Sequence, residues 1–93
     1  MKVWVVCVSD CEGDYVVAIC STKAIAEREL FKKRDELIKE WQGMIEWQKK
    51  EGRNRKDDLY QGMIDNLSSN DYEKWDNYPH DRPYLYETKI LSD

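Results

Sequence analysis

The chain is poor in the residues that interrupt regular structure, since its 93 residues include two prolines and four glycines. With 41% hydrophobic residues it is too apolar and too aromatic for a disordered segment. No apolar run approaches the ~18 residues of a membrane-spanning helix. The short apolar run Val3–Val8 lacks the length and the cleavage pattern of a secretory signal. We therefore predict one cytoplasmic domain over residues 1–93, without a membrane association.

Cysteine and histidine are scarce, with three cysteines and one histidine. An odd number of cysteines is not typical of a secreted disulfide scaffold, so we predict reduced thiols. A zinc site would need Cys7, Cys11, Cys20 and His80, but the spacing of Cys7 and Cys11 is wider than a zinc knuckle. No glycine-rich phosphate loop or activated nucleophile is recognisable. The sequence thus predicts a non-enzymatic protein with no catalytic residue, no cofactor and no metal.

Charge is distributed unevenly along the chain, although the net charge is only −4. Residues 1–56 carry twelve Lys/Arg and ten Asp/Glu, whereas residues 57–93 carry three and nine. An acidic balance argues against direct binding of a phosphate backbone. The basic cluster of residues 49–56 is short and is followed by Asp57 and Asp58, so it is interpreted as a solvated turn.

Two strands begin the chain, at Lys2–Ser9 and Asp14–Ser21, since both are rich in β-branched and aromatic residues. Gly13 offers a positive φ for a hairpin turn between them. If Glu12 and Gly13 form that turn, one face of the hairpin holds Val3, Val5, Cys7, Val16, Ala18 and Cys20. The other face then holds Trp4, Val6, Val8, Tyr15, Val17 and Ile19. Both faces are apolar, and one helix can cover only one of them. The C-terminal segment or a second protomer must cover the other.

A long amphipathic helix is predicted over Ser21–Glu51, with Ser21 or Thr22 as its N-cap and Gly52 as its stop. At 1.5 Å per residue it would be about 45 Å long, whereas an eight-residue strand covers about 27 Å. The distal half of the helix should therefore extend beyond the sheet and need another partner.

A second helix over Asp57–Leu67 is predicted to be that partner. The hexapeptides that begin at Trp41 and Tyr60 resemble each other, and an antiparallel hairpin would place Gly43 opposite Gly62, which suggests a close backbone approach. Ser69 or Asn70 could cap a short helical turn through Trp75, and Tyr84–Leu91 is predicted as a third strand. The expected fold is α+β, a small antiparallel three-stranded sheet with helices on one face, in the order ββααβ.

The segment from Asn70 to Glu87 interleaves aromatic and acidic residues. Tyr and Trp are favoured at protein interfaces, and carboxylates steer a protein toward a basic partner. The alternative is that these rings only cover a small core. We predict a partner-binding surface made of Asp71, Tyr72, Glu73, Trp75, Asp76, Tyr78 and Asp81.

Residues 2–31 resemble a loose class of small phage and mobile-element proteins. The resemblance lies in the first strand Lys2–Val6, the turn Glu12-Gly13-Asp14, and the helix start Ser21-Thr22-Lys23 followed by Ala26-Glu27. It implies an inhibitor of host defence, similar to anti-CRISPR proteins, that binds a larger basic protein or nucleoprotein in the host cytoplasm. The alternative is a structural module that forms a homodimer through the second sheet face.

Overall fold

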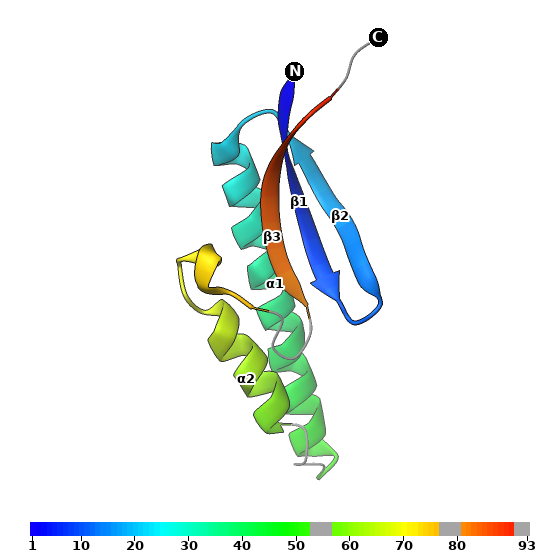
Figure 1. The fold of residues 1–93 in the computed structure, drawn as a ribbon. Helices are drawn as coiled ribbons and strands as arrows, with labels where there is room; N and C mark the ends of the chain where they lie inside the picture. Colours follow the sequence, from blue (N-terminus) through cyan, green and yellow to red (C-terminus); the bar gives the residue numbers. More distant parts are fainter. Residues whose placement is uncertain (53–56, 77–80, 91–93) are drawn as a thin grey trace.

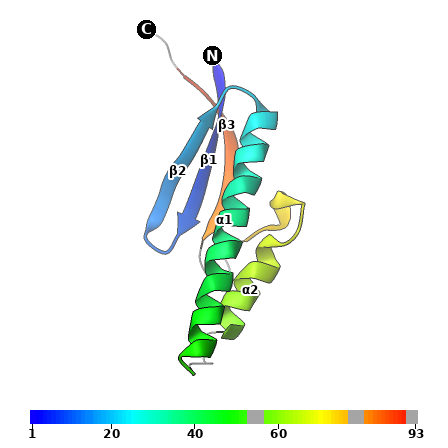
Figure 2. The same ribbon diagram turned by 180° about the vertical axis from the view of Figure 1, so that it is seen from behind.

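The computed structural model describes residues 1–52, 57–76 and 81–90, which form a three-stranded sheet and two long helices (Figures 1 and 2). In chain order the elements are β1 (Lys2–Asp10), β2 (Gly13–Cys20), α1 (Lys23–Lys50), α2 (Asp57–Leu67), the short 3-10 helix η1 (Tyr72–Lys74) and β3 (Arg82–Lys89). The predicted α+β fold, its ββααβ order and its long first helix are confirmed.

The sheet has the order β2-β1-β3, and β1 pairs antiparallel with both neighbours. One face of the sheet packs against α1, where Val6 is fully buried beside Ala26 and Leu30. The distal half of α1 continues beyond the strands, and α2 lies beside it there (Figure 1). Trp41 of α1 packs in that region with Met63, Ile64 and Leu67 of α2. The expected overhang and its partner are therefore both present.

The hairpin register differs from the predicted one at both ends of β2. Asp10 pairs with Gly13, so Cys11 and Glu12 form the turn, and Gly13 has a φ of 132°. A β-bulge then shifts the register between Val6 and Cys7, so that Val6 pairs with Ala18 and Cys7 with Val16. A bulge opposes two residues on one strand to one on its partner, which moves every residue beyond it to the other face.

The predicted faces of β2 are consequently correct between the turn and the bulge, and they are wrong for the residues beyond the bulge. Cys20 pairs with Trp4 and lies buried in the helix-side core. Ile19 pairs with Val5, so it lies on the opposite face of the sheet, where it is 64% exposed. We call this second face, which α1 does not cover, the outer face.

Both ends of α1 follow the predicted signals. The Thr22 side chain accepts a hydrogen bond from the Ile25 backbone N–H at 3.2 Å, so Thr22 is the N-cap. At the other end Gly52 adopts a φ of 69°, and its N–H donates to the Lys49 carbonyl at 3.2 Å. A left-handed residue directly after the last turn is the usual end of a helix.

The predicted close approach at Gly43 is wrong. Gly43 is exposed, and a Cβ atom at this position would meet no heavy atom within 4 Å. The helices α1 and α2 meet instead through large side chains such as Trp41 and Ile64. The glycine therefore leaves a gap in the surface of α1 and does not form a contact with α2.

The segment after α2 also differs from the prediction in detail. The cap of η1 is Asp71, whose carboxylate accepts the Glu73 N–H, and neither Ser69 nor Asn70 takes that role. The strand β3 runs over Arg82–Lys89, two residues earlier than predicted at each end. Leu85 pairs with Val6 on the helix side, whereas Tyr84 and Tyr86 pair with Cys7 and Val5 on the outer face.

Candidate protein-binding surfaces

The segment Ser68–Asp76, which contains η1, is held in place by side chains from three different elements. Arg34 of α1 donates from Nη1 to the Ser69 carbonyl at 3.4 Å. Asn66 of α2 donates to the Asp76 carbonyl at 2.9 Å, and Arg82 of β3 donates from Nε to the Trp75 carbonyl at 2.8 Å. A short segment with little regular structure is thus fixed at several backbone atoms, and its exposed side chains are pre-positioned.

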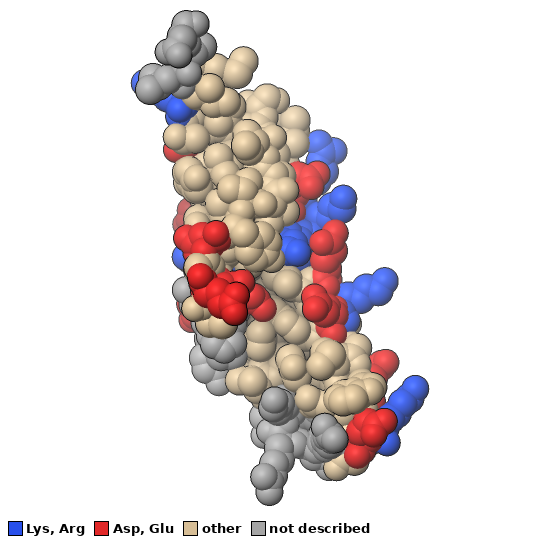
Figure 3. Space-filling view, turned by 90° about the vertical axis from the view of Figure 1, so that its right-hand side faces the viewer, with Lys and Arg blue, Asp and Glu red and all other residues tan. Residues whose placement is uncertain are grey.

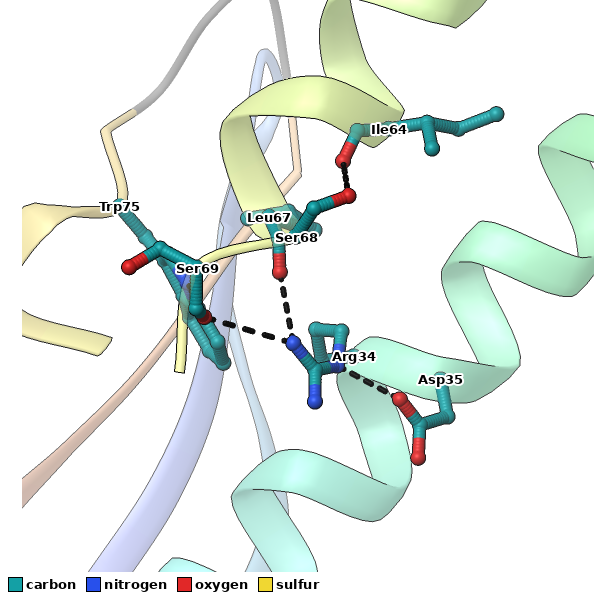
Figure 4. Close-up of polar contacts among 7 residues, drawn as sticks. All are labelled: Arg34, Asp35, Ile64, Leu67, Ser68, Ser69 and Trp75. Carbon is teal, nitrogen blue, oxygen red and sulfur yellow. Dashed lines mark hydrogen bonds and ion pairs between the residues drawn. The ribbon is translucent and has the colours of Figure 1, made fainter. Parts of the chain in front are cut away.

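Arg34 is the most highly connected of these side chains (Figure 4). Its Nη1 also donates to the Leu67 carbonyl at 2.8 Å, at the C-terminal end of α2. Its Nε donates to the Asp35 carboxylate at 2.6 Å, and the side chain is only 12% exposed. A cation at a helix C-terminus interacts favourably with the free carbonyls there. Arg34 therefore satisfies a carbonyl at the end of α2 and also holds the start of the following segment in place.

Trp75 is a core residue, which corrects its predicted place on a partner-binding surface. It is 2% exposed, and its indole N–H donates to the Ser69 carbonyl at 2.9 Å. Phe31 packs edge-on against Trp75 with ring centroids 5.7 Å apart, and the Arg34 guanidinium lies over the Trp75 ring at 5.5 Å. We remove Trp75 from the contact surface, because its ring anchors the segment from below.

Three carboxylates remain exposed on this anchored segment, at Asp71, Glu73 and Asp76. Tyr72 between them is half-buried beside Phe31, and burial together with the nearby Glu27 raises the pKa of its hydroxyl. We call Asp71–Asp76 the acidic segment.

The last two predicted contact residues are not part of the acidic segment. Asp81 is half-buried with a φ of 57°, directly before β3. Tyr78 lies outside the described residues. The structure thus places Asp71, Tyr72, Glu73 and Asp76 together and leaves their binding role a prediction.

The outer face of the sheet is a second candidate surface, and it is apolar at its centre. Val3, Val5 and Cys7 form a separate small core there, covered by Tyr84 of β3. The Tyr84 hydroxyl donates to the Asp14 carboxylate of β2 at 2.9 Å, which spans the central strand. Burial and this hydrogen bond both raise the pKa of Tyr84. The centre of the outer face is therefore covered by side chains, and neither of the described helices lies above it.

The exposed apolar side chains of the sheet are concentrated on β2. Tyr15, Val16 and Ile19 are 44%, 57% and 64% exposed. Figure 3, which views the molecule from the β2 side, shows an uncharged surface above a compact group of acidic side chains. Asp10 of β1, Glu12 of the hairpin turn and Asp14 of β2 contribute to the acidic charge at this end of the sheet. This surface of β2 was not predicted from the sequence, although the lack of polar alternation in the strand was a usable signal.

The described part of the structure also contains a cleft and three free cysteines. A cleft of about 260 Å³ lies between β3, η1 and the start of α1, lined by residues that include Trp4, Lys23, Tyr72, Glu73 and Leu85. All three cysteines are free, and only Cys11 is exposed. Among the described residues, no group of three or more His, Cys, Asp or Glu is placed to hold a metal ion.

Comparison with known proteins gives no family and no relative, since no protein-family model, no curated protein and no solved structure matches the chain. Within the described ranges, neither long helix has the length and apolar character required to cross a membrane.

Proposed function

We propose that this chain is a non-enzymatic protein-binding module that uses its acidic segment to bind a larger, basic protein or nucleoprotein. The observation that carries the proposal is the combination of three exposed carboxylates with a backbone fixed by Arg34, Asn66 and Arg82. Ordering of a loop costs free energy at the moment of binding, so a segment that is already ordered binds at a lower entropic cost.

The charge of the segment favours a basic partner over a nucleic acid. Carboxylates repel a phosphate backbone, whereas they accelerate encounter with a positively charged protein surface. A basic groove that normally holds nucleic acid is a surface of this kind. The association should weaken as salt is raised, since exposed charges are screened within about 8 Å at physiological ionic strength.

The finer proposal is that the partner is a host defence nucleoprotein and that the chain inhibits it, as anti-CRISPR proteins do. The support for this step is the resemblance of residues 2–31 to small phage proteins, together with the net charge of −4. Occupation of the groove by the acidic segment would exclude the nucleic acid. The chain needs no catalytic group for this mode of inhibition.

A plaquing assay tests the proposal. The chain is expressed in a panel of bacterial strains, each immune to a phage through one defined CRISPR system, and restored plaquing in at least one strain is expected. The variant Glu73→Lys/Asp76→Lys should lose that restoration. The control Glu36→Lys/Glu40→Lys makes the same charge change on an exposed face of α1 and should retain it. No restoration in any strain, or equal loss in both variants, would contradict the proposal.

A further inference from the structure

The cleft between β3, η1 and the first turn of α1 combines aromatic side chains with charges of both signs. Its apolar and aromatic lining includes Trp4 of β1, Tyr72 of η1 and Leu85 of β3. The charged side chains that line it are Lys23 of α1, Glu73 of η1 and Arg82 of β3. Small-molecule sites are typically concave and largely apolar, with a few polar groups that fix the orientation of the ligand. The cleft has both kinds of group.

The charged side chains of the cleft are not used by ion pairs of the fold. Within the described ranges, none of Lys23, Glu73 and Arg82 takes part in an ion pair. Lys23 is also placed against the preference of its helix, since it is the first residue of α1 and no acid stands in that turn. A cation is disfavoured at the positive end of a helix. Helix stability therefore does not explain Lys23, and its charge is available to a ligand.

Both cations are nevertheless held in place by neighbouring groups. The Lys23 ammonium lies over the Trp4 ring, 5.6 Å from the ring centroid. The Arg82 Nε donates to the Trp75 carbonyl at 2.8 Å, and the guanidinium lies over the Tyr84 ring at 5.9 Å. Donors that are already positioned bind a ligand at a lower entropic cost than mobile side chains do.

The charges of the cleft favour a ligand with one negative charge. Lys23 and Arg82 supply two positive charges and Glu73 supplies one negative charge, so a monoanion balances the cleft. A phosphate group carries close to two negative charges at neutral pH and would leave an excess beside Glu73. Burial together with Glu27 raises the pKa of the Tyr72 hydroxyl, which therefore stays protonated at neutral pH and remains a hydrogen-bond donor.

We propose that the cleft binds a small monocarboxylate whose apolar group is about as large as one amino-acid side chain. The carboxylate contacts Lys23 and Arg82, and the apolar group lies against Trp4 and Leu85. An arginine can offer a carboxylate two parallel donors. The volume of about 260 Å³ lies below the ~300–1,000 Å³ of pockets for drug-sized ligands, so the ligand is small. A free acid and the C-terminus of a peptide both present this chemistry.

An NMR titration of the isotope-labelled chain with phenylacetate tests the proposal. We expect a saturable shift of the Trp4 indole N–H signal, with a dissociation constant of about 0.1–1 mM. The indole signal of Trp47, near the other end of α1, should not move. Phenylacetamide has the same ring without the charge and should bind about tenfold more weakly or less. Tighter binding of acetyl-glycyl-phenylalanine than of phenylacetate would identify a peptide C-terminus as the source, and the reverse order a free acid.

Charge variants of the chain locate the binding. Lys23→Glu should raise the dissociation constant of phenylacetate about tenfold or more, and it should not unfold the protein, because an acid suits the first turn of a helix. The matched control Lys39→Glu makes the same change at an exposed position of α1 outside the cleft and should leave binding unaltered. Glu73→Gln removes the anion and should lower the dissociation constant about threefold.

Two results would overturn the proposal. One is the absence of a saturable shift at Trp4 with either acid, and the other is an equal loss of binding in Lys23→Glu and Lys39→Glu. The titration uses the chain alone, so its outcome is independent of the proposed binding to a basic protein.

Discussion

The two sides of the sheet are built differently, although both edge strands have eight residues and both pair with β1. On the β3 side, the segment Ser68–Asp76 is attached by hydrogen bonds from three elements and by a fully buried tryptophan. On the β2 side, three apolar side chains stand exposed and no described element covers the edge. The β3 side is therefore covered by residues of the same chain, whereas apolar side chains of β2 stay exposed.

The difference shows that a small domain can stabilise the two edges of its sheet unequally. Folding a chain of this size buries somewhat more than ~60% of its unfolded surface, so few residues can serve the core. Here the core extends toward β3 through Trp75 and Phe31. Substitutions on the β3 side should therefore cost more unfolding free energy than matched substitutions elsewhere.

Trp75→Ala should cause the largest loss, because it removes the buried ring that anchors the β3 side. Deletion of a buried aromatic side chain costs about 3–5 kcal/mol of unfolding free energy. Chemical denaturation monitored by circular dichroism gives the value. Trp47→Ala is the matched control, since Trp47 is 48% exposed and should cost less than about 1 kcal/mol. Similar losses for the two variants would contradict the anchoring role of Trp75.

Two neighbouring residues of α1 face the two sides and allow a direct comparison. Arg34→Ala leaves the Leu67 and Ser69 carbonyls without their charged donor and should cost about 2 kcal/mol. Lys33 lies over the Tyr15 ring of β2 at 5.9 Å, and Lys33→Ala should cost at most about 0.5 kcal/mol. Denaturation midpoints of both variants measure the difference. Equal losses of stability in the two variants would contradict the difference between the β3 side and the β2 side.

Gly43→Ala should stabilise the protein by about 1 kcal/mol, since alanine is the better helix former. A Cβ atom at this position meets nothing within 4 Å, so no packing cost opposes the gain. Thermal unfolding should show a higher midpoint. Gly43 lies on neither side of the sheet, so this variant gives a reference value for a change in stability that does not depend on either edge. A lower midpoint would show that α2 approaches Gly43 more closely than the structure indicates.

Tyr84→Phe tests the hydrogen bond by which Tyr84 of β3 contacts Asp14 of β2. The folded protein holds the Tyr84 pKa above its usual value of about 10, whereas the unfolded chain ionises near pH 10. The folded state then binds more protons than the unfolded state, so stability falls as the pH rises past about 10. Denaturation from pH 8 to 11 should show a shallower fall for Tyr84→Phe than for the unaltered chain. Parallel curves would show that burial and the Asp14 hydrogen bond do not raise the pKa of Tyr84 in the folded protein.

Local signals in the sequence were sufficient to place the elements. The N-cap Thr22, the stop at Gly52 and the helical pattern of Asp57–Leu67 all act within a few residues of each other. The β-bulge could not be predicted, because both strands are apolar on both faces and no alternation distinguishes one register from the next. Its consequence, Ile19 on the outer face and Cys20 in the core, depends on how the whole hairpin meets α1.

The acidic composition of this segment is visible in the sequence, but the sequence does not show which of its side chains form a surface. Asp71, Glu73 and Asp76 are exposed, as expected for carboxylates next to a core. Trp75 could not be assigned from the sequence, because its burial depends on Phe31 and Arg34, which lie about forty residues earlier. The exposed edge of β2 was also missed, since only the strand order β2-β1-β3 makes it an edge.

The strand order also determines when the sheet can be completed during synthesis. The first strand must wait for its second neighbour, since Lys2 pairs with Lys89 and Ser9 with Arg82. At the usual rate of chain elongation this separation corresponds to a delay of roughly 4–16 s. During that interval the nascent hairpin and α1 can form, but β1 presents its own open edge. The protein therefore passes through a stage in which its central strand is as unprotected as β2 is in the finished fold.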